Sequence, residues 1–299
     1  MRKISKLGTV ALATVALAMG SAGVGSAGSV SSNGLTLTVK DSPFFVKGTQ
    51  GTLINYCGPA PLYEGATLRQ AVSATSPYGI ASWDIGTLLP EGTYVWAHYA
   101  QIAPPVIRFQ ADNYQGDCGG GQGGVGGHVA LVTDNHGNQV AMEEYLSVEV
   151  ARWDNSHINS EQIGTWSYSG AWLAQNQCAA CDNGSQTYST TAGASATFLL
   201  DGNAFFGWPS GHLALMVTQG PGHGKAALYL DGKQVATVDT LASAVKNRMY
   251  VWDFGPLAPG QHIIKVVNLG TSGRPRIDVN AMGFVRGSTH VSTCTPTTC

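Results

Sequence analysis

The sequence predicts an all-β protein, and three observations lead to this fold class. The chain contains 39 glycines and 13 prolines among 299 residues, and they interrupt it throughout. Short apolar runs bounded by these residues continue from Leu35 to Val285, which is typical of strands separated by turns. Only residues 66–74 and 241–246 have a helical composition, and no long stretch keeps a helical period.

The expected strands are segments in which apolar and polar residues alternate, since alternate side chains of a strand face opposite sides of a sheet. They are residues 93–99, 106–110, 129–133, 194–200, 226–230, 235–238, 249–254, 262–269 and 277–284. Asp231-Gly232 predicts a two-residue hairpin, because glycine accepts the positive φ of a primed turn. Residues 135–138, Asn-His-Gly-Asn, predict a second hairpin turn.

Residues 1–27 are typical of an export signal. A basic start is followed by the apolar run 7–19 and by small residues up to Ala27, the order found in secretory signal peptides. No later window is apolar enough to span a bilayer. We therefore expect a secreted protein, extracellular or associated with a cell wall, without a membrane span.

The rest of the chain divides by composition. The polar run 154–163 has no burial pattern, which predicts a linker. It separates an N-terminal domain, residues 35–153, from a C-terminal domain, residues 164–287. Residues 288–299 form a tail rich in serine and threonine.

Charge excludes nucleic acid as a partner. Removal of the signal leaves 13 basic against 18 acidic side chains, a net charge of −5, and phosphate binding needs clustered Lys and Arg. The Gly-rich stretch 119–127 lacks the lysine and the helix of a phosphate-binding loop. No organic cofactor is expected.

Six cysteines in an exported protein are expected to form disulfides. Spacing favours Cys178 with Cys181 and Cys294 with Cys299, and elimination leaves Cys57 with Cys118. Six cysteines allow fifteen pairings, so the sequence alone does not fix these three.

The C-terminal domain resembles the galactose-binding-like, carbohydrate-binding jelly-roll module of secreted actinobacterial proteins. The similarity rests on the strings at 188–198, 207–208, 220–226, 229–232, 235–239 and 257–262. It implies a β-sandwich that binds an extracellular polysaccharide or peptidoglycan, with aromatic rings stacked on sugar rings. The candidate rings are Trp166, Trp172, Trp208, Tyr229 and Trp252.

The end of this domain also bears on metal binding. Asp278 lies where the family often ends in Val-Asp-Val-Asp-Ala, but Asn280 replaces the second carboxylate. A calcium site there would lose charge, so we expect no metal ion.

Two resemblances compete for the N-terminal domain. The segment 127–133, with 137–140 and 143–145, is similar to the His and acid strands of CHAP-type cysteine peptidases that cut peptidoglycan. This resemblance implies Cys57 as nucleophile, His128 as base and Glu144 as the group that orients the imidazole. However, Gly58-Pro59 follows Cys57, and proline opposes the helix that lowers the thiol pKa in that family.

The segments 67–77 and 85–95 instead resemble the opening of a bacterial Src-homology-3-type barrel, and 139–146 resembles its last hairpin. This alternative explains the lack of helices. We therefore expect a small N-terminal barrel followed by a jelly-roll sandwich, in a secreted non-catalytic protein that binds a surface polymer. The alternative is a CHAP-like peptidase or amidase with the sandwich as its targeting module.

Overall fold

The fold is all-β, as predicted. The computed structural model describes residues 28–39, 44–51, 64–69, 72–88, 94–99, 108–111, 125–152, 163–181, 184–205 and 210–293. Within these ranges every element with stated bounds is a strand, apart from the 3-10 turn η2 (Gly202–Phe205). The expectation of helical structure was wrong in the described part of 66–74, which lies in two strands, and in 241–246, which precedes and starts another strand.

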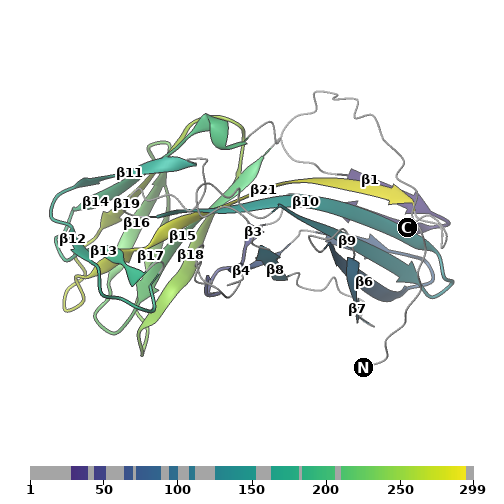
Figure 1. Ribbon diagram of the computed structural model, residues 1–299, viewed down its shortest axis with the longest axis horizontal. Helices are drawn as coiled ribbons and strands as arrows, with labels where there is room; N and C mark the ends of the chain where they lie inside the picture. The colour runs from purple at the N-terminus through teal and green to yellow at the C-terminus, as the bar shows by residue number, and fades with distance from the viewer. Residues whose placement is uncertain are drawn as a thin grey trace, which may run out of the picture.

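A seven-stranded antiparallel sheet runs along the length of the molecule (Figure 1). Its order is β18-β15-β21-β10-β9-β6-β7. In that order the strands are β18 (Lys246–Leu257), β15 (Gly211–Gln219), β21 (Ala281–Thr293), β10 (Gln139–Arg152), β9 (Val125–Asp134), β6 (Ile80–Leu88) and β7 (Tyr94–Tyr99).

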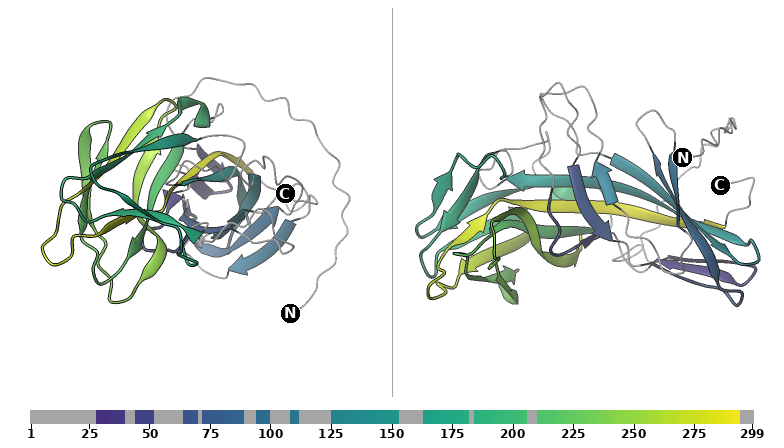
Figure 2. Two further views of the ribbon diagram at one scale, coloured as in Figure 1. Left: turned by 60° about the vertical axis from the view of Figure 1, so that its left-hand side comes forward. Right: turned by 90° about the horizontal axis from the view of Figure 1, so that it is seen from below.

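The two long central strands hold this sheet together. β10 has 14 residues and β21 has 13, and they pair from Val140 with Thr293 to Arg152 with Ala281. Figure 2 shows them side by side from the sandwich end to the opposite end. Residues 288–293, expected in a Ser/Thr tail, are therefore the last part of a central strand.

The sandwich is completed by two further sheets. The five-stranded sheet has the order β11-β14-β19-β16-β17 and the three-stranded sheet has the order β12-β13-β20. Their strands are β11 (Gly164–Ser169), β14 (Ser195–Leu200), β19 (His262–Asn268), β16 (Lys225–Leu230), β17 (Lys233–Asp239), β12 (Leu173–Gln175), β13 (Gln186–Ser189) and β20 (Ile277–Val279).

The sandwich core lies between the five-stranded sheet and β15, β18 and β21. Phe198, Leu228 and Ile264 come from one side and Leu213 and Phe284 from the other, and all five are fully buried. Burial of a large apolar side chain contributes about 1.5–3 kcal/mol. This core fixes the strands that carry the candidate rings.

A second core lies at the other end of the long sheet. It gathers Leu35, Trp83, Val132 and Met142 with residues such as Tyr250. The small sheet β1-β2-β5 lies at this end, whereas the small sheet β3-β4-β8 lies nearer the sandwich, where its β3 contacts β15 and β18 (Figure 1). The strands of these two small sheets are β1 (Gly28–Ser32), β2 (Leu35–Val39), β5 (Val72–Thr75), β3 (Phe44–Phe45), β4 (Glu64–Arg69) and β8 (Arg108–Ala111).

The expected N-terminal barrel is not formed by the residues that the structure describes. β6, β7, β9 and β10 join β21, β15 and β18 in one open sheet, so their edges do not close on one another. The physical reason is the length of β21, which continues past the sandwich and pairs with β10. The division into two domains stays a prediction.

Both predicted hairpin turns are confirmed. Asp231 and Gly232 have φ values of 50° and 81°, as a primed turn requires, and they join β16 to β17. Gly137 has a φ of 80° between β9 and β10. Among the described residues no helix is long and apolar enough to cross a membrane.

Candidate functional site

The candidate ring of Trp166 meets a second aromatic ring, that of Tyr168, on the edge strand β11. Trp166 and Tyr168 are two residues apart on this strand and share a face, and Trp166 packs its ring on Phe198 at a centroid distance of 5.1 Å. The Tyr168 ring lies nearly parallel to the Trp166 ring, at 6.3 Å and 10°. Trp166 is 5% exposed, whereas Tyr168 is 37% exposed. The stack therefore runs from the core to the surface.

Trp172 completes this cluster, which we call the β11 aromatic group (Trp166, Tyr168 and Trp172). Its ring lies 5.3 Å from the Tyr168 ring at an angle of 53°. The indole Nε1 donates a hydrogen bond to the Ser169 carbonyl oxygen at 3.3 Å, and the side chain packs against the sandwich core. The ring orientation is thus set by contacts on three sides.

The other candidate rings lie apart from this group. Across the five-stranded sheet, Trp166, Phe198, Ile264 and Leu230 pair in one line and face the core. Tyr229 precedes Leu230 on the same strand and pairs with Lys265, so its side chain faces the opposite side of the sheet, away from the core. The ammonium of Lys47 lies 5.8 Å from the centre of the Trp252 ring, a cation–π contact that covers one face. Trp208 lies outside the described residues.

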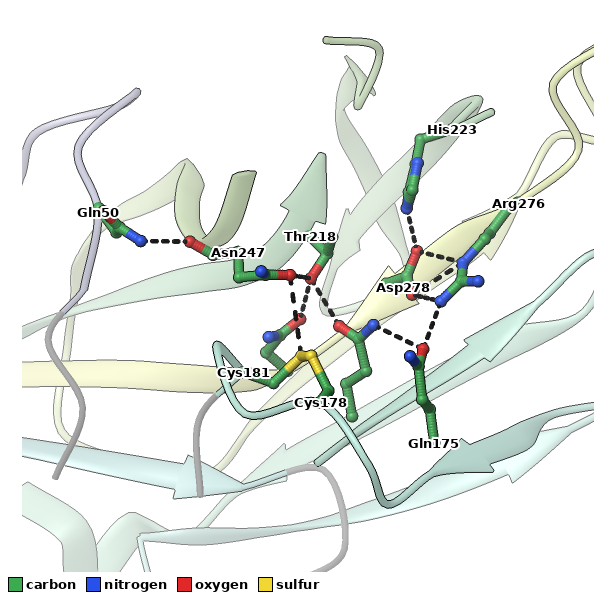
Figure 3. Close-up of a disulfide and its surroundings, with 11 residues drawn as sticks. Gln50, Gln175, Cys178, Cys181, Thr218, His223, Asn247, Arg276 and Asp278 are labelled. Atoms are coloured by element: carbon green, nitrogen blue, oxygen red, sulfur yellow. Dashed lines mark hydrogen bonds and ion pairs between the residues drawn. A yellow bond between two sulfur atoms is a disulfide. The ribbon is translucent and has the colours of Figure 1, made fainter. Parts of the chain in front are cut away.

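A buried carboxylate on β20 organises the polar part of the same sandwich (Figure 3). Asp278 is fully buried and accepts hydrogen bonds from Arg276, with Nε to both carboxylate oxygens at 3.0 Å. On its other side, Nε2 of the buried His223 lies 2.6 Å from Oδ2 of Asp278. A buried carboxylate requires such partners, because desolvation of an unpaired charge is costly.

Arg276 is held by three further contacts. Its Nη2 donates to Oδ1 of Asp278 and, at 2.8 Å, to Oε1 of Gln175, and the guanidinium lies 4.0 Å from the centre of the Tyr188 ring. Burial by itself would lower the pKa of Arg276, but the hydrogen bonds and negative charge of Asp278 raise it above its ordinary value. The guanidinium therefore stays charged and fixed.

This pairing also bears on the calcium question. The oxygens of Asp278 already contact a guanidinium, whose positive charge repels a cation. Nowhere in the described part of the chain do three or more His, Cys, Asp or Glu side chains gather as metal ligands would. The donor set around Asp278 thus suits an ion pair.

The predicted Cys178–Cys181 disulfide is present, and its loop is tied to this network. Gln175 Oε1 also accepts a hydrogen bond from Gln186 Nε2 at 3.0 Å. The hydroxyl of Thr218 lies 2.6 Å from Oε1 of Gln186 and 3.0 Å from Oδ1 of Asn247. Figure 3 shows this continuous path from Arg276 to the disulfide.

The remaining cysteine predictions, Cys57 with Cys118 and Cys294 with Cys299, lie outside the described residues. The other two residues of the peptidase alternative lie on paired strands. Glu144 of β10 is directly opposite His128 of β9 in the antiparallel register. A base and its orienting acid need neighbouring positions of this kind.

Sequence reasoning missed three residues of this surface: Tyr168, Tyr188 and Arg276. Tyr168 follows Trp166 by two residues, and this spacing on an expected strand places both on one face. Arg276 is two residues before Asp278, but no pattern shows that the carboxylate is buried. The signal for Tyr168 was available, whereas that for Arg276 required the tertiary structure.

Comparisons with known proteins find similarity among solved structures alone. No family model matches, and no curated protein matches. Among solved structures, the chain is similar to the CBM36-1 domain of a multidomain xylanase from the hindgut metagenome of Trinervitermes trinervoides, with 8% identity, a TM-score of 0.32 and coverage of 46% of this chain and 96% of that one.

Two further solved structures are similar to this chain, with comparably low sequence identity and TM-score. A carbohydrate-binding module CBM36 in complex with calcium and xylotriose has 12% identity and a TM-score of 0.27, with 48% of this chain and 98% of that one covered. An exo-beta-1,3-galactanase from Phanerochaete chrysosporium with galactose has 10% identity and a TM-score of 0.30, with 89% and 96% covered. The functional argument below therefore rests on the residues of this chain.

Proposed function

We propose that this chain is an exported, non-catalytic protein that binds a polymeric glycan through the β11 aromatic group of its sandwich. The observation that carries the proposal is the pair of rings formed by Tyr168 and Trp172. Tyr168 is 37% exposed, and its ring and the Trp172 ring lie 5.3 Å apart at the molecular surface.

Core packing explains only part of this cluster. Trp166 is buried against Phe198 and belongs to the core. Tyr168 leaves more than a third of its surface in water, and its neighbours hold the ring in one orientation. A fixed, exposed aromatic face loses little conformational entropy on binding, and sugars present apolar C–H faces that can stack on it.

The export signal predicted for residues 1–27 and the Cys178–Cys181 disulfide support an extracellular location, since disulfides persist in oxidising compartments. The ligand is then a polymer met outside the cell, a polysaccharide or the glycan strands of peptidoglycan. The same setting suits a protein attached to a cell wall.

The test is depletion of the purified protein by insoluble polysaccharides and purified cell walls. We expect retention on at least one polymer, and we expect Trp172→Ala to weaken it by about 2 kcal/mol, roughly 30-fold, as for a central aromatic contact. Tyr78→Ala is the matched control, because Tyr78 is 43% exposed but lies in the turn before β6. No retention on any polymer, or equal losses in both variants, contradicts the proposal.

A second candidate function is a CHAP-like cysteine peptidase or amidase acting on peptidoglycan, with the sandwich as targeting module. The opposed positions of His128 and Glu144 favour it. Its test is the clearing of a cell-wall suspension by the wild-type protein and by Cys57→Ala, with titration of free thiols. Clearing that requires Cys57 supports the hydrolase, and a bridged Cys57 or absence of clearing excludes it.

A further inference from the structure

The Arg276 side chain is held in one orientation by a buried anion. Its Nε and Nη2 face Asp278, which is fully buried and also contacts His223. The guanidinium cannot turn away without leaving that buried carboxylate with His223 as its one remaining partner among the contacts above, which is destabilising. Its remaining edge therefore points in a fixed direction.

That remaining edge carries unused hydrogen-bond donors. A guanidinium has five N–H groups, and the contacts to Asp278 and Gln175 use those on Nε and Nη2. Nη1 has no partner among the residues that the structure describes, and the Arg276 side chain is 29% exposed. Figure 3 shows the third nitrogen of Arg276 pointing away from Asp278.

An aromatic ring and an exposed apolar side chain lie next to the guanidinium in the small sheet β12-β13-β20. Tyr188 lies beneath the guanidinium and is directly opposite Leu173 in the register of β13 and β12. Leu173 is 57% exposed. Tyr188 is also directly opposite Asp278 in the register of β13 and β20, so Leu173, Tyr188 and Asp278 lie in one row of this small sheet.

The charges favour an anionic group over a hydroxyl at this position. Nε and Nη2 of Arg276 face Asp278, and Nη1 lies on the opposite side of the guanidinium. A ligand carboxylate at Nη1 therefore has the positive charge of Arg276 between itself and the negative charge of Asp278. Hydrogen bonds between a guanidinium and a carboxylate are roughly twice as strong as neutral ones. The partly buried setting also reduces screening by salt.

We propose that Arg276, Tyr188 and Leu173 form a subsite for the carboxylate of an acidic sugar unit, with Arg276 Nη1 donating to the carboxylate and Leu173 contacting the sugar ring. This inference rests on the proposed function and narrows it to glycans that carry uronic-acid units.

The experiment compares acidic polymers with neutral derivatives of the same backbone. Polygalacturonate, alginate and hyaluronan are each tested beside their carboxyl-reduced form, together with neutral insoluble polysaccharides, by depletion or affinity electrophoresis. We expect at least one acidic form to bind tenfold or more tightly than its reduced form.

The decisive variant is Leu173→Asp, because removal of Arg276 would unpair Asp278 and endanger the fold. Leu173 is exposed and pairs with Tyr188, whose ring lies beneath the guanidinium, so a new carboxylate at position 173 opposes the approach of a ligand carboxylate. We expect the acidic form to lose more affinity than the reduced form, so that the preference for the acidic form disappears. Leu269→Asp is the matched control. Leu269 is also exposed, at 47%, and its replacement by aspartate adds the same negative charge at a different place on the sandwich.

The outcomes separate the two proposals. Equal binding of acidic and reduced polymers, or equal effects of Leu173→Asp and Leu269→Asp, overturns the acidic subsite and leaves glycan binding in place. Retention of no polymer, acidic or neutral, overturns both.

Discussion

Two buried carboxylates, Asp134 at one end of the molecule and Asp278 in the sandwich, are satisfied in different ways. Oδ1 of Asp134 accepts hydrogen bonds from the backbone N–H groups of His136 and Asn138, both at 2.9 Å. Its Oδ2 accepts from the Ser76 hydroxyl at 2.8 Å and from Asn138 Nδ2 at 2.9 Å. All four donors are neutral and belong to two adjacent turns.

Asp278 instead relies on a charged side chain, Arg276, and on His223. The donors around Asp134 are consumed within the β9–β10 turn and its neighbour, so that carboxylate only fixes a hairpin. Asp278 fixes an arginine that still has donors to offer at the surface. Asp134 therefore fixes a structural turn, whereas Asp278 fixes a side chain that reaches the surface and that we propose to bind a ligand.

The largest effect is expected for Asp278→Ala. The variant leaves the half-buried Arg276 without its counter-ion, and breaking a buried pair in this way costs about 3–5 kcal/mol. Urea denaturation followed by tryptophan fluorescence measures the loss. A loss below about 1 kcal/mol would mean that Arg276 is not held by Asp278.

Asp134→Ala is expected to have a smaller effect. Its donors lie at the tip of a hairpin where water can replace part of the lost bonding, so we expect a loss of about 1–3 kcal/mol. Polymer binding should not change, because this turn lies at the opposite end of the long sheet. Binding reduced in step with stability would contradict the separation of the two ends.

An exposed arginine–aspartate pair in the same sandwich is the control for the buried one. Arg274 donates to Asp239 at 2.9 Å, but the two side chains are 24% and 40% exposed. The hydrogen bond from Arg274 is the main cause that lowers the pKa of Asp239. Because water solvates both groups, Asp239→Ala should lower the free energy of unfolding by only about 0–1 kcal/mol in the same urea assay. If Asp239→Ala lowered the free energy of unfolding as much as Asp278→Ala does, the buried pair would contribute no more to stability than the exposed pair.

The smallest effect concerns pH. Burial by itself would raise the pKa of Asp134, but hydrogen bonds from Asn138, Ser76 and the backbone lower it below its ordinary value. The ionised group therefore stabilises the fold above the unfolded pKa of about 3.9, and this contribution is lost as the pH falls through the lowered folded pKa.

In thermal melts, the Tm advantage of the wild type over Asp134→Asn should be constant near neutral pH and should shrink below about pH 4. Asn cannot titrate, so the variant isolates this one group. An advantage that stays the same in strong acid would show that Asp134 does not titrate in the folded protein.

Local patterns in the sequence were sufficient to predict the strands and hairpins. Alternation located β14, β16 and β19, and Asp231-Gly232 located a turn, because these features depend on neighbouring residues alone. The open seven-stranded sheet was not predicted, because the pairing of β10 with β21 joins residues more than a hundred positions apart.

The candidate site was predicted only in part, for a similar reason. The sequence identified Trp166 and Trp172, yet could not show that one is buried and that the other lies beside an exposed Tyr168. Arg276 gave no signal, because its significance depends on the burial of Asp278 and on a ring from β13.

The central claim is that the β11 aromatic group contacts a glycan polymer, and footprinting by hydroxyl radicals tests this claim most directly. With a retained polysaccharide present, oxidation of Tyr168 and Trp172 should fall several-fold, while that of Tyr78 at the other end of the molecule should not change. Protection of Tyr78 with unchanged oxidation of Tyr168 and Trp172 would contradict the account.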